Sequence, residues 1–308
     1  LAYNILVILF GAYVRATGSG AGCGAHWPLC NGVVLPRPER VETIIEFTHR
    51  ITSGLALVLV LILVWRVWRA YGKGSLVKKS AFLALFFTIT EALVGAGLVL
   101  FQLVEDNDSI ARAISMVVHL VNTFLLTGSL ALTAWWVTDG EPDRIRFQGL
   151  SGFLTLAGVI GMLLLGASGA IAALGDTLFP ATSLTEAFRE DFSPTAHYLI
   201  QLRVYHPVIA VSVGIYLFLA TAWIRRGVKG VRLEQFANLL FVFYLLQLAL
   251  GIVNVALLAP VWMQIVHLLV TNLIWITFVL LAGEVFGRLT IGRVHQSVNQ
   301  PVHSVTRE

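Results

Sequence analysis

The sequence predicts an all-α integral membrane protein with eight transmembrane helices, arranged as two pseudo-twofold-related four-helix bundles. Three observations support this fold class. The chain is 57% hydrophobic and only 12% charged, with a mean hydropathy of +0.82, which excludes an ordinary soluble domain. It contains repeated apolar stretches of the roughly 20 residues that a spanning helix needs. Histidine motifs also recur at matching places in its two halves.

Seven stretches are long enough to cross a bilayer, at 43–70, 80–101, 111–137, 149–173, 198–224, 234–258 and 261–287. Residues 1–16 are apolar from the first residue and lack the basic start and cleavage site of a signal peptide. We therefore interpret them as the remainder of a further spanning helix, which brings the expected number to eight.

The distribution of basic residues predicts the orientation of these helices. Lys and Arg cluster after the second, fourth, sixth and eighth spans, and such clusters are retained in the cytoplasm. The loops 17–42, 102–110 and 174–197 contain fewer of them and are predicted to face outward. We expect a multi-pass protein of the plasma membrane, in contact with lipid. The net charge of +4 then reflects topology, and no nucleic-acid partner is expected.

Both cysteines, Cys23 and Cys30, lie in the first outward loop. Disulfides form and persist on the oxidising side of a membrane, so a Cys23–Cys30 disulfide is the favoured interpretation. Two free thiols, or half of a metal site, are the alternatives. The second of these is weak because no other cysteine exists to complete a zinc site.

Internal similarity divides the chain into an N-terminal half, 1–137, and a C-terminal half, 138–308, which ends in a polar tail. His49 on the second helix corresponds to His206 on the sixth, and His119 on the fourth corresponds to His267 on the eighth. All four are predicted to lie in one layer, on the order of 10 Å below the outer surface. Because both halves start from the same side, the repeat is a parallel one.

The histidines admit two interpretations. A single buried histidine often only makes a hydrogen bond between helices. Four at matching positions favour paired axial ligation of haem iron across the core of each bundle. Small residues such as Gly54 and Gly95 would leave room for a flat macrocycle. Zinc is disfavoured because two histidines fill only half of its tetrahedron. Arginines near the outer helix ends are candidates to bind haem propionates, namely Arg15, Arg50, Arg112 and Arg203.

One acidic residue distinguishes the halves. Glu46 precedes His49 by three residues on the same helix face, whereas Arg203 occupies the matching position before His206. Glu91 is a second buried acid, replaced by Gln247 in the other half. Glu46 either takes part in chemistry or only binds Arg50 or a loop amide. The asymmetry favours chemistry in the first half and a permanent haem in the second.

Two motifs point to a family. The run from Gly18 to Gly32, followed by Ile45-Glu46-Phe47-Thr48-His49-Arg50, closely resembles the first outer loop and second helix of haem A synthases. The resemblance extends over the whole chain through the eight-helix plan and the four histidines. Some members carry a second cysteine pair in the outer loop of the second half, and residues 174–197 here have none.

The resemblance implies an oxidoreductase that converts the C8 methyl of haem O to the formyl group of haem A, for cytochrome oxidase. It implies that His49 and His119 ligate the substrate haem, that His206 and His267 ligate the iron of a haem b cofactor, and that Glu46 is catalytic. It also implies the Cys23–Cys30 disulfide. Haem O synthase and cytochrome oxidase assembly factors are expected partners, and a homo-oligomer is compatible with the sequence.

Two other functions fit the same histidines. A transmembrane electron carrier would hold two b-type haems and do no substrate chemistry. A haem delivery protein would bind haem O and release it unchanged.

Overall fold

The computed structural model describes residues 1–37, 40–147 and 149–287. The polar tail expected after residue 287 lies outside the described residues. The regular elements in these ranges are helices, and the one extended pairing is an isolated bridge between Cys30 and Val33. The predicted all-helical class is therefore confirmed.

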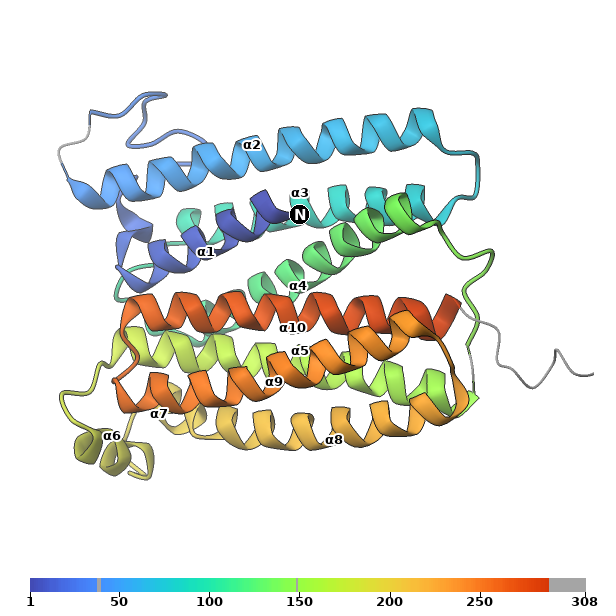
Figure 1. Ribbon diagram of the computed structural model, residues 1–308. Coiled ribbons are helices and arrows are strands. Elements are labelled where there is room, and N and C mark those ends of the chain that lie inside the picture. The colour runs from blue at the N-terminus through green and yellow to red at the C-terminus, as the bar shows by residue number, and fades with distance from the viewer. Residues whose placement is uncertain (38–39, 148, 288–308) are drawn as a thin grey trace, which may run out of the picture.

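The chain runs through the two predicted halves in turn (Figure 1). The first half contains α1 (Ala2–Ala16), the short 3-10 helix η1 (Ser19–Ala21), α2 (Val41–Ala70), α3 (Leu76–Leu100) and α4 (Ile110–Asp139). The second contains α5 (Gly149–Leu178), α6 (Leu184–Asp191), α7 (Tyr198–Arg203), α8 (Tyr205–Gly227), α9 (Val231–Ala256) and α10 (Val261–Gly287).

Seven segments are long and apolar enough to span a membrane, with α7 and α8 together forming one of them. They correspond to the seven stretches predicted from the sequence. The expected eighth span, residues 1–16, is the apolar helix α1, whose 15 residues are shorter than a complete crossing. The count of eight and the twofold relation between the halves remain predictions.

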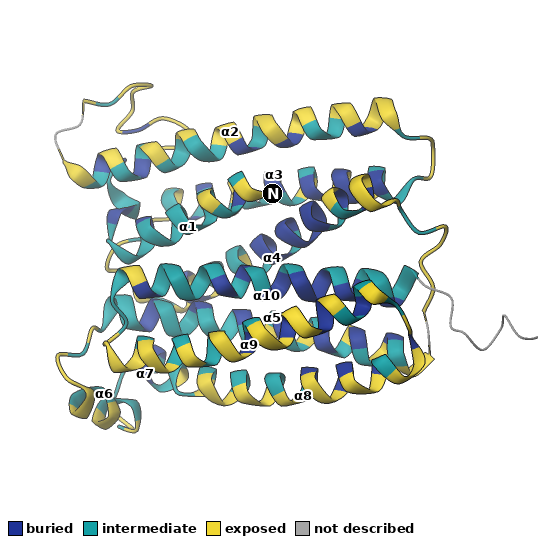
Figure 2. Ribbon diagram, viewed as in Figure 1, coloured by how far each residue is buried: buried dark blue, intermediate teal, exposed yellow. Residues whose placement is uncertain are grey.

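Helices α4 and α10 form the centre of the molecule. In their most apolar windows 39% and 44% of residues are buried, against 11% in α9. Figure 2 shows this difference as dark blue ribbon on α4 and α10 and largely yellow ribbon on α2, α8 and α9. Helices α4 and α10 also pack against each other, which joins the two halves. The outer helices present apolar side chains where a soluble protein would carry charge.

The loop 174–197 and the sixth predicted span differ from expectation. The loop contains a helix, α6, whose first turn is capped because the Ser183 hydroxyl accepts from the Glu186 amide at 3.2 Å. The span predicted at 198–224 is divided at Val204 into α7 and α8. Pro207 explains the division: it has no N–H to continue the ladder and is tolerated only in the first turn of a helix.

Candidate functional site

The Cys23–Cys30 disulfide is present and closes the loop that follows α1. This loop packs on the first turns of α2. The Thr43 hydroxyl donates to the Gly22 carbonyl at 2.7 Å, and the Cys23 amide donates to Oε2 of Glu46 at 2.7 Å. Gly22 is required at this contact, since a Cβ there would lie 2.4 Å from the Glu42 backbone. We call the end of the bundle that carries this loop the disulfide end.

Glu46 is only 3% exposed, and both of its carboxylate oxygens have partners. Oε1 accepts from the Arg50 guanidinium, while Oε2 accepts from Cys23. Arg50 in turn donates to the carbonyls of His26 at 2.7 Å and Leu29 at 2.6 Å. The sequence suggested that Glu46 could bind Arg50 or a loop amide, and the structure shows both contacts. Glu46 is a buried anion that ties α2 to the disulfide loop, held at one turn from His49.

The four histidines lie in one layer near the disulfide end, as predicted. Each is six to nine residues beyond the first residue of its span, which places it on the order of 10 Å inside the helix. His49 lies within electrostatic range of His119, and His267 lies within electrostatic range of His206. The structure thus brings together the two pairs that the sequence predicted.

A glycine on the preceding long helix faces each imidazole. A Cβ built on the glycine would approach the facing ring to between 3.0 and 4.0 Å; the pairs are Gly11 with His49, Gly95 with His119, Gly169 with His206, and Gly251 with His267. A side chain at these positions would fill the space beside the ring. The sequence pointed to Gly95 but not to the glycines on α1, α5 and α9. Gly54 is exposed and has no neighbour within 4 Å, so it does not face an imidazole as these four glycines do, and its proposed role remains a prediction.

The ring nitrogens are arranged in a way that suits axial ligation of iron. Nδ1 of His206 is 2.9 Å from the Ser168 hydroxyl, and Nδ1 of His119 is 3.2 Å from Oε1 of Glu91. Within the described part of the chain, Nδ1 of His49, His119 and His267 has no hydrogen-bond partner, so Glu91 and His119 are related by distance and charge. No hydrogen bond or ion pair is recorded there for Nε2 of any of the four. Nε2 is the atom that ligates when a second group orients Nδ1, as Ser168 does for His206. Among the described residues, Nε2 is without a protein partner in all four, so these residues fit a haem in each half.

Glu91 and its counterpart Gln247 are bonded differently. Glu91 accepts from the side chains of Asn122 and Thr123 on α4 and also contacts His119. Gln247 donates to the Thr271 hydroxyl at 2.6 Å and to the His267 carbonyl at 3.1 Å, and does not reach an imidazole nitrogen. The two halves therefore differ in the charge beside a histidine ring.

The four arginines proposed for propionates are all held by protein groups. Arg50 is bound as described above, and Arg203 pairs with Asp176 at 3.2 Å and Asp191 at 2.6 Å. Arg112 is buried and donates to backbone carbonyls of the 102–109 loop. Arg15 reaches from α1 to the second half, where it donates to the Ala173 carbonyl at 2.7 Å. Their role toward propionates remains a prediction.

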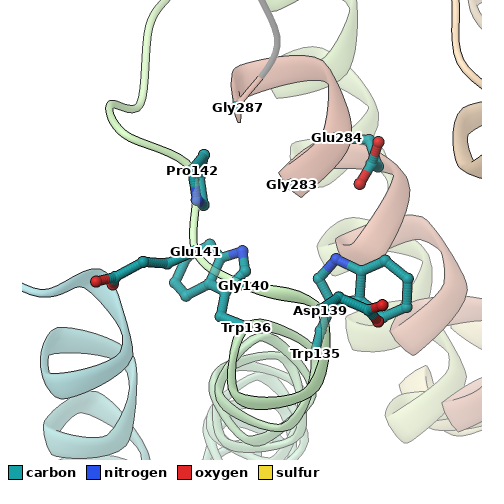
Figure 3. Close-up of a pocket in the computed structure, with 9 residues that line it drawn as sticks. All are labelled: Trp135, Trp136, Asp139, Gly140, Glu141, Pro142, Gly283, Glu284 and Gly287. Atoms are coloured by element: carbon teal, nitrogen blue, oxygen red, sulfur yellow. The ribbon is translucent and has the colours of Figure 1, made fainter. Parts of the chain in front are cut away.

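A cavity opens at the other end of the bundle, between the last turns of α4 and α10 (Figure 3). No histidine lines it. Two of its carboxylates already hold neighbouring helices: Asp139 pairs with Arg232 on α9, and Glu141 accepts from the Ser75 hydroxyl and the Val77 amide at the start of α3. The cavity is distant in the fold from the histidine layer and does not belong to it.

Fold and site together define a multi-pass helical membrane protein that carries two pairs of histidines within its spanning helices. The family model described as "Cytochrome oxidase assembly protein" (COX15-CtaA) matches residues 1–279. The chain belongs to this family.

Curated relatives carry two different names. A "Heme A synthase" from Halalkalibacterium halodurans is 30% identical over 283 residues, covering 89% of this chain and 90% of that protein. One from Lysinibacillus sphaericus is 44% identical over 97 residues, about a third of each chain. A "Protoheme IX farnesyltransferase" from Thermus thermophilus is 53% identical over 288 residues, covering 94% of this chain but 47% of that protein. The chain thus spans about half the length of this relative.

Proposed function

We propose that the protein is a haem A synthase that oxidises the C8 methyl of haem O to a formyl group. The observation that carries this proposal is the asymmetry between two otherwise similar histidine pairs. Among the described residues, only the pair His49 and His119 has a buried carboxylate, Glu46, one turn away and a disulfide-closed loop packed against that carboxylate. The substrate haem is assigned to this pair. His206 and His267 are assigned to a resident haem b.

The relatives support this activity over farnesyl transfer. The match to the heme A synthase from H. halodurans extends over nearly all of both proteins. The match to the Thermus farnesyltransferase takes in less than half of that protein, so its name describes a longer chain. The likeness does favour a functional link with haem farnesylation, because haem O is a farnesylated haem. Haem O synthase and cytochrome oxidase assembly factors are accordingly proposed as partners.

The two halves have different tasks in this proposal. When bound, haem b supplies one-electron redox chemistry. His206, held by Ser168 through Nδ1, and His267 keep that group fixed in the second half. In the first half, His49 and His119 hold and orient the substrate. The facing glycines let each imidazole lie close to the neighbouring helix, and a side chain in their place would crowd the ring.

Glu46 is proposed to act on the methyl carbon. The electrons that the methyl loses pass to an external oxidant. Their loss creates positive charge on that carbon, which a fixed anion in a low-dielectric site stabilises while it accepts the proton. Its contacts with Arg50 and the Cys23 amide hold the carboxylate in place. The disulfide loop therefore serves to position the catalytic carboxylate.

The proposed orientation puts the disulfide end on the outer side of the plasma membrane. Two observations support this orientation. Basic residues cluster at the opposite end, and a disulfide requires an oxidising environment.

Glu46→Gln tests the catalytic assignment. Glutamine can still accept from the Cys23 amide but carries no charge, so we expect bound haem to be retained and haem A formation to fall by roughly 100-fold or more. Haem A is measured by extracting pigments from the purified protein and separating haems B, O and A. The matched control is Glu141→Gln, which changes a carboxylate that also accepts a backbone N–H but lies at the opposite end.

The pigments of the unmodified protein separate the alternatives. A haem A synthase contains haem B together with haem O and haem A. Haem B alone would indicate an electron carrier, and haem O without haem A would indicate a delivery protein. Normal haem A yield from the Glu46 variant would remove this residue from the mechanism.

A further inference from the structure

Glu91 contacts one of the four imidazoles, and it is the acid nearest to a ring nitrogen. Its Oε1 lies 3.2 Å from Nδ1 of His119. The same carboxylate accepts from the Thr123 hydroxyl and the Asn122 amide, one turn further along α4. Two neutral donors on the helix that carries His119 therefore hold the carboxylate beside the ring.

The second half lacks this arrangement at the corresponding place. Gln247 takes the position of Glu91 and Thr271 that of Thr123, yet the glutamine amide donates to the His267 carbonyl and to Thr271. Among the described residues neither His119 nor His267 has a hydrogen-bond partner at Nδ1, but His119 has a carboxylate 3.2 Å from that atom and no such contact is found for His267. Both halves thus keep a hydrogen-bonded link between corresponding helices, α3 with α4 and α9 with α10. Of the two described sites, only the first has a carboxylate beside the imidazole.

We propose that Glu91 is a positioning residue that orients Nε2 of His119 toward the iron and makes the haem of the first half easier to oxidise than that of the second. The inference rests on the proposed assignment of His49 and His119 to the substrate haem. It concerns the axial ligand and is independent of the role of Glu46.

The physical reason is electrostatic. A carboxylate that accepts from the distal nitrogen of a metal-bound imidazole fixes the tautomer and increases the electron donation of the ring. Ferric haem carries one more positive charge than ferrous haem, so a nearby anion at low dielectric stabilises the ferric state. Electron donation and charge act in the same direction. A ligand with a carboxylate beside it favours oxidation, which suits a substrate haem that must lose electrons. A ligand without that charge suits a haem that must accept electrons.

The test exchanges the two residues in the haem-loaded full-length protein. Glu91→Gln keeps the size of the side chain and its ability to bond Thr123, but removes the charge. Gln247→Glu introduces the charge in the second half. The midpoint potentials of both haems are measured by spectroelectrochemical titration in detergent, with the pigment composition determined on the same samples.

We expect Glu91→Gln to raise the potential of one haem and leave the other unchanged, while Gln247→Glu lowers the potential of that other haem. A shift of about tenfold in the ferric-to-ferrous equilibrium, or roughly 59 mV for a one-electron couple, is the expected size. Thr123→Val is the structural control, since it disturbs the contact between the helices and keeps the charge. It should shift the potential less than Glu91→Gln does.

The outcomes separate this inference from the proposed function. If both haems are bound and neither exchange moves a potential, Glu91 only ties α3 to α4 and the inference is wrong, although haem A synthesis stands. If Glu91→Gln does not fold, Gln247→Glu alone decides, because a carboxylate added beside His267 must lower one potential. If the unmodified protein carries a single haem, the proposed function fails first and the inference fails with it.

Discussion

At the scale of single residues, the glycines facing the imidazoles are the most direct test of haem binding. A Cβ at Gly11 would lie 3.0 Å from Cε1 of His49, so a valine there must displace the ring. We expect Gly11→Val to weaken haem binding in the first half by roughly tenfold or more. This is the usual effect of changing a residue that orients a metal-binding side chain. Haem content per protein, measured by pyridine haemochrome absorbance, reports this loss.

The control for this change is Gly54→Val on α2. Gly54 lies five residues beyond His49, is exposed, and has no neighbour within 4 Å of the added Cβ. It should retain a normal haem content. Equal loss from both variants would contradict the assignment of Gly11 to the haem site.

Residue types and spacings predicted the histidine pairs and the disulfide, but not which groups contact them. Glu46 was recognised because it shares a helix face with His49, and its two structural contacts were named as an alternative. Gly11 was missed for a physical reason. Apolar helices contain many glycines, and which one faces a histidine depends on the rotation of two helices about their axes. The sequence does not encode that rotation in any simple period.

At the scale of elements, the contact between the disulfide loop and α2 depends on a few hydrogen bonds. The Thr43 hydroxyl is buried and donates to the Gly22 carbonyl. Thr43→Val removes this donor at nearly constant volume and should destabilise the docked loop by about 1 kcal/mol. We expect faster proteolytic cleavage within residues 17–40 and a lower melting temperature.

Thr52→Val is the matched control on the same helix. Its hydroxyl bonds only carbonyls of α2 itself, those of Thr48 and His49. Its replacement should leave cleavage of the loop unchanged. If both variants are cleaved like the unmodified protein, the Thr43 contact does not hold the loop.

The elements that were not predicted had visible signals. Hydropathy is continuous through 198–224, so the sequence favoured a single helix, yet Pro207 marks the division between α7 and α8. The run Ser183-Leu184-Thr185-Glu186 has the spacing of a capping box at the start of α6. Both signals are local. The long apolar stretch 198–224 favoured one continuous helix over a division at Pro207, and the polar composition of 174–197 favoured a loop over a helix.

At the scale of the whole molecule, the two halves are joined largely through α4, which packs against both α5 and α10. Helix α4 carries His119 and α10 carries His267. The sequence predicted two halves but not the helices through which they meet, because burial against protein and burial against lipid both select apolar residues. In the structure, the larger buried share of α4 and α10 distinguishes them from the outer helices. Arg15 adds a polar link at the disulfide end, where it bonds Gln264 on α10 at 2.8 Å.

Trp275 on α10 is the central side chain of this interface. It is 2% exposed, stacks on Phe124 of α4 with ring centroids 5.2 Å apart, and donates its indole N–H to the Phe124 carbonyl at 2.6 Å. Gly128 permits the approach, since a Cβ there would lie 3.3 Å from the indole nitrogen. Trp275→Ala should therefore cost roughly 3–5 kcal/mol, the usual effect of deleting a large aromatic core residue.

Trp262→Ala provides the comparison, because Trp262 lies on the same helix but is 58% exposed. We expect thermal unfolding in detergent, followed by haem absorbance, to show a clear loss of stability for Trp275→Ala and little change for Trp262→Ala. Because α4 and α10 each carry a histidine that we propose as a haem ligand, the first variant should release haem from both halves over the same temperature range. Equal melting temperatures for the two variants, or loss of haem from one half alone, would show that the α4–α10 contact does not couple the halves.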